Sequence, residues 1–344
     1  MDNWENKFRG CLIGGAAGDA LGYAVEFMNE TSIFSEYGEH GITEYKLTNG
    51  IARISDDTQM TMFTAAALID GAVSGNYMDS IVRGYRGWYQ TQAGGAAVRD
   101  SDNSRIGQLL GITELYSRRA PGVTCLSALG SGKVGTIEDP INDSKGCGGV
   151  MRVAPIGLIF ANGSFSEVAQ NEIDMLGAKA AAITHGHELG YIPAAALVHI
   201  INFLVRNDRY TFIDAVADSV LAMRKLFGDT KNVKLFHRLM EKAVTLAENG
   251  TDDLTAIHQL GEGWVAEETL AIAVYCAVKY QNNFGKAICA AVNHNGDSDS
   301  TGAVCGNILG AAFGYDRIPQ KFKDNLELHD ILIGLADDLM ICAP

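Results

Sequence analysis

Proline is scarce in this sequence, and so are the alternating patterns typical of β-strands. Only 6 of the 344 residues are proline, against 39 glycines. Proline interrupts helices and central strands, so its scarcity favours long, unbroken helices. Residues 41–47 are the one segment for which we expect either a short strand or a loop.

Basic residues are few as well. The chain has 27 Lys and Arg against 41 Asp and Glu, and its formal net charge is −14. This balance disfavours nonspecific binding to nucleic acid or to anionic lipid, because both attract basic surfaces. We find no apolar run that approaches membrane-spanning length, and the polar, acidic first residues do not resemble a signal peptide. We therefore expect a soluble, cytoplasmic protein with neither a nucleic acid nor a membrane as partner.

Paired cysteines are missing. The seven cysteines are scattered and form no CxxC pair. This arrangement predicts neither a disulfide framework nor a zinc–thiolate site, and it fits a reducing cytoplasm.

Helical periodicity is the main positive signal. Hydrophobic residues make up 47% of the chain, enough for a large buried core. Phe212, Val216, Val220 and Met223 recur on one helical face, and similar patterns appear in several other stretches. No internal repeat or low-complexity segment interrupts them. We predict an all-α protein that forms a single domain over residues 1–344.

Two series of glycines are spaced by four residues. The first is Gly14, Gly18 and Gly22, and the second runs through Gly302, Gly306, Gly310 and Gly314. On a helix this spacing places each series on one face, where the missing side chains let two backbones approach closely. We infer that these two helices pack near each other and carry a functional site between them.

Two acidic clusters precede helical patterns, SDDT at 55–58 and DSDS at 297–300. Each could simply cap its helix. Asp297 and Asp299 with neighbouring hydroxyls also form an all-oxygen ligand set, which suits Mg²⁺ or Mn²⁺ better than Zn²⁺. An EF-hand is excluded because its twelfth loop position, a glutamate, is Ile308 here.

Asp19 and Glu26 lie in an otherwise apolar stretch. Buried carboxylates need partners, so we expect Glu26 to belong to the site, whereas a structural salt bridge is an equal alternative for Asp19. Among the histidines, His185 is the main candidate for ligand contact and His294 a weaker one. Trp264 is expected in the core, with stacking on adenine as the alternative.

A glycine-rich segment at residues 146–150 is the last candidate. Its successive N–H groups can cradle a phosphate, although it matches neither a P-loop nor a Rossmann fingerprint. Its cysteine has no visible base partner and is not proposed as a nucleophile. The following Arg152 could instead be a structural ion-pair partner. The segment consists of Gly146, Cys147, Gly148, Gly149 and Val150.

Four motifs in order resemble those of the ADP-ribosylglycohydrolase family. They are RGCLIGGAAGD at 9–19 followed by Glu26, SDDT at 55–58, GCGGVMRVAP at 146–155 and GDSDSTG at 296–302. The resemblance extends from about residue 8 to about residue 315. It implies a single orthogonally packed helical domain with two Mg²⁺ or Mn²⁺ ions at its centre.

The resemblance also implies roles for the candidate residues. Glu26 matches a glutamate close to the metals and the scissile bond, and residues 146–150 and His185 match surfaces that hold ADP-ribose. We assign water activation to a metal with Asp57 or Asp297 as catalytic base, and proton transfer or gating to Glu26. Many relatives have threonine where this chain has Ser55 and Ser300, and both serines keep the hydroxyl. The implied metal ligands are Ser55, Asp56, Asp57, Asp297, Asp299 and Ser300.

The expected activity is metal-dependent hydrolysis of the N- or O-glycosidic bond between ADP-ribose and an acceptor. The acceptor would be a protein side chain, with arginine favoured, or a small ADP-ribosyl compound. One alternative is a catalytically silent ADP-ribose binder, and another is a two-metal hydrolase of a different phosphate-containing substrate. Loops 91–104 and 130–143 are expected to shape acceptor choice, with Asp100 and Asp102 as candidate contacts to a guanidinium.

Overall fold

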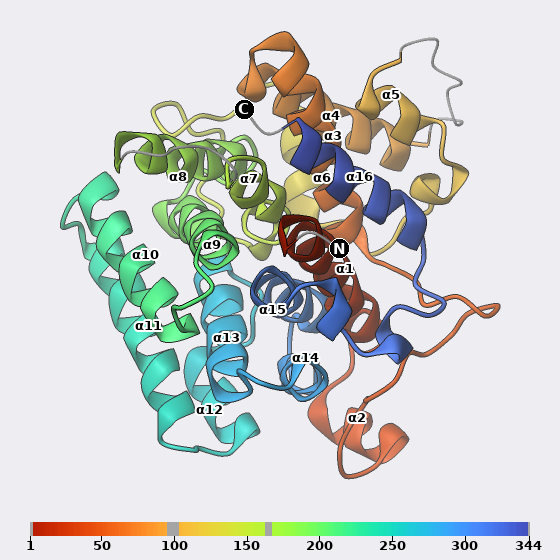
Figure 1. The fold of residues 1–344 in the computed structure, drawn as a ribbon, viewed down its shortest axis with the longest axis vertical. Helices are drawn as coiled ribbons and strands as arrows, with labels where there is room; N and C mark the ends of the chain where they lie inside the picture. The colour runs from red at the N-terminus through yellow and green to blue at the C-terminus, as the bar shows by residue number, and fades with distance from the viewer. Residues whose placement is uncertain (1–2, 95–102, 162–166, 343–344) are drawn as a thin grey trace.

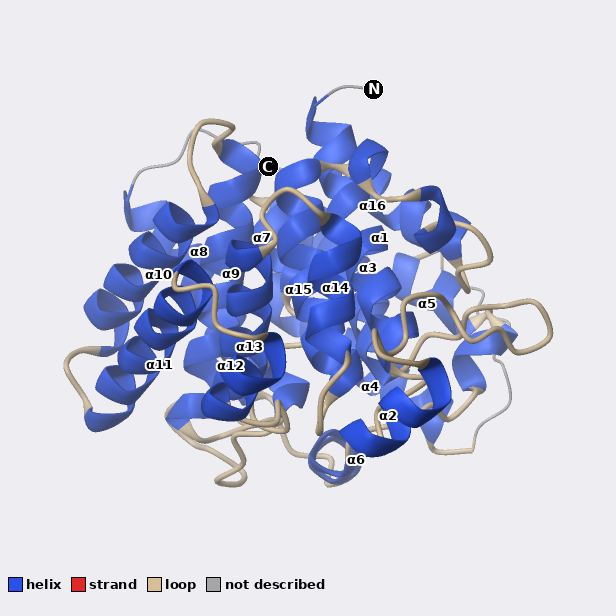
Figure 2. Cartoon of the chain, turned by 90° about the horizontal axis from the view of Figure 1, so that it is seen from below, coloured by secondary structure: helices blue, strands red, loops and turns tan. Residues whose placement is uncertain are grey.

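The computed structural model describes residues 3–94, 103–161 and 167–342, where helices are joined by loops and turns (Figures 1 and 2). In this part of the chain there is no β-strand, only three isolated bridges such as Gly146 with Val265. Residues 41–47 are a loop. The all-α prediction is confirmed, whereas the prediction of a single catalytic domain over 1–344 stays a prediction.

The connections between the helices range from short ones, such as residues 75–76, to long loops such as 38–55 and 131–146. Within the described ranges, four 3₁₀ helices lie between the α-helices: Thr113–Tyr116, Cys147–Gly149, Tyr315–Arg317 and Gln320–Phe322. The α-helices are α1 Asn3–Gly22, α2 Glu30–Tyr37, α3 Asp56–Ser74, α4 Tyr77–Gln92, α5 Arg105–Leu110, α6 Val123–Gly130, α7 Ala154–Ile159, α8 Glu167–Ala182, α9 Glu188–Arg206, α10 Phe212–Phe227, α11 Lys231–Glu248, α12 Asp253–Leu260, α13 Ala266–Lys279, α14 Phe284–Val292, α15 Ser298–Phe313 and α16 His329–Ile341.

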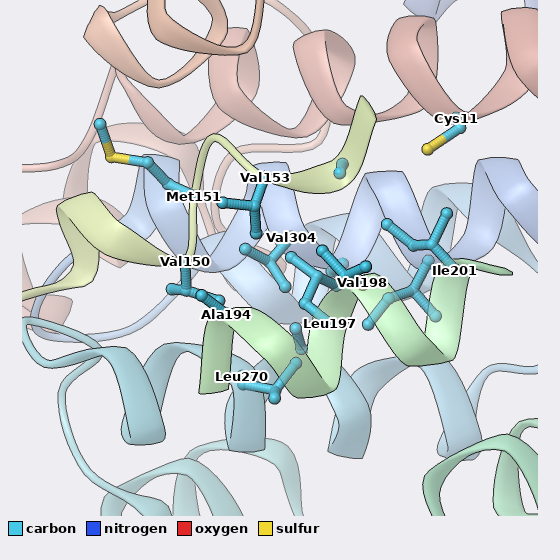
Figure 3. Close-up of a cluster of buried hydrophobic side chains, with 14 of the residues drawn as sticks. Cys11, Val150, Met151, Val153, Ala194, Leu197, Val198, Ile201, Leu270 and Val304 are labelled. Atoms are coloured by element: carbon cyan, nitrogen blue, oxygen red, sulfur yellow. The ribbon is translucent and has the colours of Figure 1, made fainter. Parts of the chain in front are cut away.

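Helix α9 lies in the core. Its residues Ala194, Leu197, Val198 and Ile201 pack with side chains from α13, α15 and the segment before α7 (Figure 3). By length and composition α9 would suffice to cross a membrane, which corrects the expectation that no such run exists. However, 89% of its most apolar window is buried inside the protein, as in the core helix of a globular fold.

Helices α1 and α15 lie side by side at the centre (Figure 1) and meet through their glycines. A Cβ on Gly14 would stand 2.3 Å from the carbonyl oxygen of Gly306, and one on Gly18 would stand 1.9 Å from that of Gly302. The predicted packing of the two glycine-bearing helices is confirmed. Because early residues of α1 meet late residues of α15, the helices are antiparallel.

This antiparallel contact decides where the functional residues go. At one end of the contact, Gly22, the C-terminal residue of α1, touches Ser298, the first residue of α15. Glu26 follows α1 by one turn of chain, and Asp297 and Asp299 stand at the start of α15. The packing therefore brings the two ends of the sequence together at one end of the helix pair.

We predict that Gly14→Ala destabilises the protein by about 3 kcal/mol, because the methyl group meets backbone that cannot move aside. The matched control is Gly334→Ala in α16, where a Cβ meets nothing within 4 Å. That change should instead stabilise the helix by up to about 1 kcal/mol. Urea unfolding measures both, and equal effects would contradict the close backbone contact.

Candidate active site

One cavity of about 510 Å³ gathers most of the predicted site residues. Both acidic clusters, the glycine-rich segment, Glu26 and His185 contribute to its wall. Three predicted residues, Ser55, Gly149 and Val150, are not among the lining residues. Those that line it are Glu26, Asp56, Asp57, Gly146, Cys147, Gly148, His185, Asp297, Asp299 and Ser300.

Both acidic clusters cap their helices as well as line the cavity. The Ser55 hydroxyl accepts a hydrogen bond from the N–H of Asp57 at 3.2 Å, at the start of α3. Asp297 accepts one from the N–H of Ser300 at 3.3 Å, at the start of α15. The two helices therefore direct their positive ends toward the same group of carboxylates, which favours negative charge there.

Asp19 matches neither of the two alternatives expected for it, a place in the site or a structural salt bridge. It is fully buried and accepts hydrogen bonds from the N–H of Ser55 at 3.0 Å and of Thr58 at 3.1 Å, and from the Thr58 hydroxyl. It neither pairs with a described cation nor lines the cavity. A side chain of α1 thus caps α3 and holds the first acidic cluster beside the glycine contact.

Residues 118–125 form a wall that the sequence did not reveal. The N–H of Gly122 donates to the Asp56 carboxylate at 3.1 Å, and the N–H of Asp56 donates to the Arg119 carbonyl at 3.1 Å. Arg119 forms a buried ion pair with Glu327 at 3.1 Å. The Glu327 carboxylate also accepts a hydrogen bond from the N–H of Ile54. The segment therefore orients Asp56 through its backbone, a role that no residue type signals.

Burial and mutual repulsion raise the pKa values of the acidic side chains. Burial, with repulsion from Asp299 next, raises the pKa of Asp19 to about 7 and that of Glu26 to about 10. The same two causes raise the pKa of Asp57 well above its usual value, and the pKa values of Asp56 and Asp297 are likewise well above theirs. These carboxylates cannot all be charged at neutral pH without a compensating cation.

Two oxygens in this group lack partners. Among the described residues, nothing hydrogen-bonds to the buried Oδ2 of Asp57 or Oε2 of Glu26. In the same part of the chain, no three His, Cys, Asp or Glu side chains stand close enough together to hold an ion as they are placed. The two-metal centre therefore stays a prediction, with unpartnered acceptor oxygens at the position where it is expected.

The glycine-rich segment is held at the cavity by the residues before α13. The N–H of Cys147 donates to the Trp264 carbonyl at 3.1 Å. Gly149 is buried in the 3₁₀ helix Cys147–Gly149 and does not line the cavity, whereas Gly148 does. Among the described residues, no acceptor outside this helix contacts the N–H of Gly148, which can therefore donate to an anion. Val150, in contrast, is fully buried in the core (Figure 3).

Comparison with known proteins now decides the family. The family model of the ADP-ribosylglycohydrolases matches residues 1–343. The chain belongs to the ADP-ribosylglycohydrolase family. It is therefore a hydrolase of glycosyl bonds to ADP-ribose.

Individual relatives cover nearly the whole chain. An uncharacterised protein of Archaeoglobus fulgidus is 26% identical over 97% of this chain and 96% of its own. ADP-ribosylhydrolase ARH3 of Mus musculus is 23% identical over 97% and 91%, and ADP-ribosylarginine hydrolase Tri1 of Serratia proteamaculans is 25% identical over 98% and 80%. A solved ADP-ribosylglycohydrolase-related protein complex shares the fold, with a TM-score of 0.61, 21% identity and full coverage of both chains.

The two candidate histidines of this ADP-ribosylglycohydrolase lie in different surroundings. His185 lines the cavity. His294 is buried, and its ring nitrogens contact the Asn295 carbonyl at 2.8 Å and the Ala291 carbonyl at 2.9 Å, so it is a structural residue. Cys147 lines the cavity too, but burial and the neighbouring Asp297 raise its thiol pKa well above the usual value, which disfavours a thiolate nucleophile.

The expectation of a core position for Trp264 is wrong. Its side chain is 41% exposed and lines the cavity, where it stacks on Phe27, which is 76% exposed, with ring centroids 6.4 Å apart. Phe27 was missed, although its place next to Glu26 was a usable signal. A pair of exposed aromatic rings at a cavity is suited to contact a ligand.

The loops expected to shape acceptor choice do not line this cavity where they are described. No residue of 130–143 contributes to its wall. Helix α4 continues through Gln92, and Asp100 and Asp102 lie outside the described residues. The segment 118–125 takes the wall position instead, with Arg118 as the cationic residue among those lining the cavity.

We predict that Asp19→Ala destabilises the protein by about 3 kcal/mol, because buried N–H groups of Ser55 and Thr58 lose their acceptor. Asp252→Ala is the matched control: Asp252 also accepts from a backbone N–H and a threonine hydroxyl, but it is exposed at the start of α12. It should cost about 1 kcal/mol. Chemical unfolding separates the two, and a smaller loss for Asp19→Ala would contradict the capping role.

Proposed function

We propose that this protein is a divalent-cation-dependent hydrolase that releases ADP-ribose from an ADP-ribosylated protein side chain or from a small ADP-ribosyl compound. The observation that supports this most directly is the single cavity lined by Asp56, Asp57, Asp297 and Asp299 together with the glycine-rich segment. It combines an acidic site for cations with the N–H group of Gly148 for an anionic ligand.

The residues present fit a pair of hard cations. The donors are carboxylate and hydroxyl oxygens, which Mg²⁺ and Mn²⁺ prefer. The unpartnered oxygen of Asp57 and the raised pKa values of its neighbours indicate a group that lacks a counter-charge. Bound Mg²⁺ or Mn²⁺ would supply Lewis-acid chemistry and stabilise developing charge. The proposed ligands are Ser55, Asp56, Asp57, Asp297, Asp299 and Ser300.

We assign the diphosphate of ADP-ribose to the N–H group of Gly148 and to His185. The exposed rings of Trp264 and Phe27 would contact a planar or apolar part of the substrate. This arrangement leaves the distal ribose for the acidic end of the cavity, where Glu26, Asp57 and Asp297 lie.

Hydrolysis breaks the bond between C1″ of the distal ribose and the acceptor atom, through a transition state resembling an oxocarbenium ion. Water adds to C1″ and gives a proton to Asp57 or Asp297, and the leaving acceptor atom takes up a proton. Glu26, whose pKa is raised to about 10, holds a proton at neutral pH in the cation-free protein and is placed to transfer one.

Arginine is the acceptor that we favour. Tri1, which aligns with 98% of this chain, is named an ADP-ribosylarginine hydrolase. The decisive experiment measures free ADP-ribose released from arginine-linked and serine-linked peptides with Mg²⁺, with Mn²⁺ and with EDTA. We expect release from the arginine-linked peptide with either cation and its loss in EDTA. Release of inorganic phosphate instead would indicate a phosphoester substrate.

Variants of the acidic clusters test the assignment. We expect Asp57→Asn and Asp299→Asn each to lower the hydrolysis rate by more than about 100-fold, because even changes outside the ligand shell cost about 10- to 100-fold in metal sites. Asp79→Asn is the control, since Asp79 also lies in the first turn of a helix but is exposed. Full turnover by either cluster variant would reject the assigned roles.

Cation binding should also be visible in stability. The raised folded-state pKa values mean that the cation-free protein holds extra protons, so its stability falls as pH rises above about 4, the usual carboxyl pKa. Mn²⁺ replaces those protons, and at 100 times its Kd it should add about 2.7 kcal/mol. We expect a larger rise of Tm with Mn²⁺ at pH 8 than at pH 6, and a much smaller rise for Asp57→Asn. An equal rise with NaCl would contradict specific binding.

A further inference from the structure

Arg152 is fully buried, yet it has no carboxylate partner among the described residues. Its Nη2 donates to the Thr184 hydroxyl at 2.7 Å and to the Ala180 carbonyl at 3.1 Å, and its guanidinium lies 4.1 Å over the ring of Tyr85. The expectation of a structural ion pair is therefore wrong. A buried cation satisfied only by neutral groups is costly to keep, and its strongest contact leads through Thr184 to the cavity.

The Thr184 hydroxyl has one proton to donate. Its oxygen already accepts from Arg152, and its other neighbours are Nδ1 of His185 at 2.8 Å, the Ala181 carbonyl at 3.5 Å and the Cys125 thiol. The shorter contact is the better hydrogen bond, and sulfur is a weak acceptor. With the reverse assignment, two donors would converge on one hydroxyl oxygen, and its own proton would be left on the 3.5 Å contact or on the sulfur. The geometry therefore makes Nδ1 of His185 the acceptor.

We propose that Thr184, held by the buried Arg152, is a positioning residue that fixes His185 as the neutral tautomer with its proton on Nε2, so that Nε2–H donates to an oxygen of ADP-ribose in the cavity. The identity of the ligand rests on the proposed function. The tautomer rests only on the contacts within the protein.

Two glycines keep Nε2 accessible. A Cβ on Gly146 would stand 3.3 Å from Nε2, and one on Gly148 would stand 2.9 Å from Cε1 and 3.3 Å from Nε2 of the same ring. Any side chain at these positions would crowd this edge of the imidazole. Nε2 has no hydrogen-bond partner among the described residues, and His185 lines the cavity.

Electrostatics also favours the neutral ring. Burial, and then the positive charge of Arg152, lower the pKa of His185 to about 3. The acidic side chains of the cavity accept hydrogen bonds when they are ionised, so they add no donor for the ligand. ADP-ribose is rich in acceptor oxygens and needs donors from the protein. A histidine that presents N–H adds a donor beside Gly148, while one that presents its lone pair would repel a phosphate oxygen.

The first test needs no variant. In protein labelled with ¹⁵N-histidine at neutral pH, two-bond ¹H–¹⁵N correlation should show His185 as one neutral species with Nε2 protonated and Nδ1 accepting a hydrogen bond. His185→Gln identifies its signals. A protonated Nδ1 in the wild-type protein would overturn the proposal.

The second test removes the hydroxyl. In Thr184→Val the Nδ1 signal should move to the position of an imidazole nitrogen without a hydrogen-bond donor, and ADP-ribose should bind about 3- to 10-fold more weakly, as expected for one lost hydrogen bond. Thr184→Ser should restore both. Thr91→Val is the control, because Thr91 is also buried and its hydroxyl donates to a carbonyl in α4. An unchanged Nδ1 signal in a folded Thr184→Val variant would overturn the relay.

The two proposals fail differently. If the wild-type protein does not bind ADP-ribose, the proposed function is overturned, while the Nδ1 signals of the wild type and of Thr184→Val still decide the relay. If ADP-ribose binds equally to the wild type and to Thr184→Val, the positioning role is overturned and the proposed function stands.

Discussion

The backbone contact between α1 and α15 is the constraint on which the rest of the molecule depends. Glycine faces glycine along the pair, so the helix axes approach more closely than side chains would allow. The antiparallel direction then brings the C-terminal end of α1 to the first turn of α15. Asp19 extends this arrangement to α3 by capping its first turn, and three segments far apart in sequence thereby share one acidic cavity.

The carboxylates of that cavity destabilise the folded protein locally, and the same carboxylates suit the cavity to bind a ligand. Burial and repulsion raise the pKa values of its carboxylates, and unpartnered oxygens of Asp57 and Glu26 remain inside it. The positive ends of α3 and α15 offset part of this cost. Two neutral donors, the N–H group of Gly148 and the Nε2–H proposed for His185, complete a surface suited to an anionic substrate with many oxygens.

Much of the fold and of the candidate site was predictable because the signals are local or periodic. Helical hydrophobic spacing indicated an all-α protein, and the spacing of Gly14, Gly18 and Gly22 indicated close helix packing. The position of Trp264 was missed because an aromatic residue in a glycine-rich loop can turn either way. The segment 118–125 was missed because it acts through backbone N–H groups, which every residue type carries. Cytoplasmic location stays a prediction.

The sequence by itself determined the chemistry available: acidic clusters at helix starts, glycines that permit contact, and a motif set that indicates the family. Those are properties of residue type and spacing along one helix or turn. Only the tertiary structure decided that Asp19 caps a neighbouring helix, that Val150 lies in the core, and that Arg152 reaches His185 through Thr184. Each of these depends on the direction of a side chain between elements, which follows from packing geometry rather than from local order.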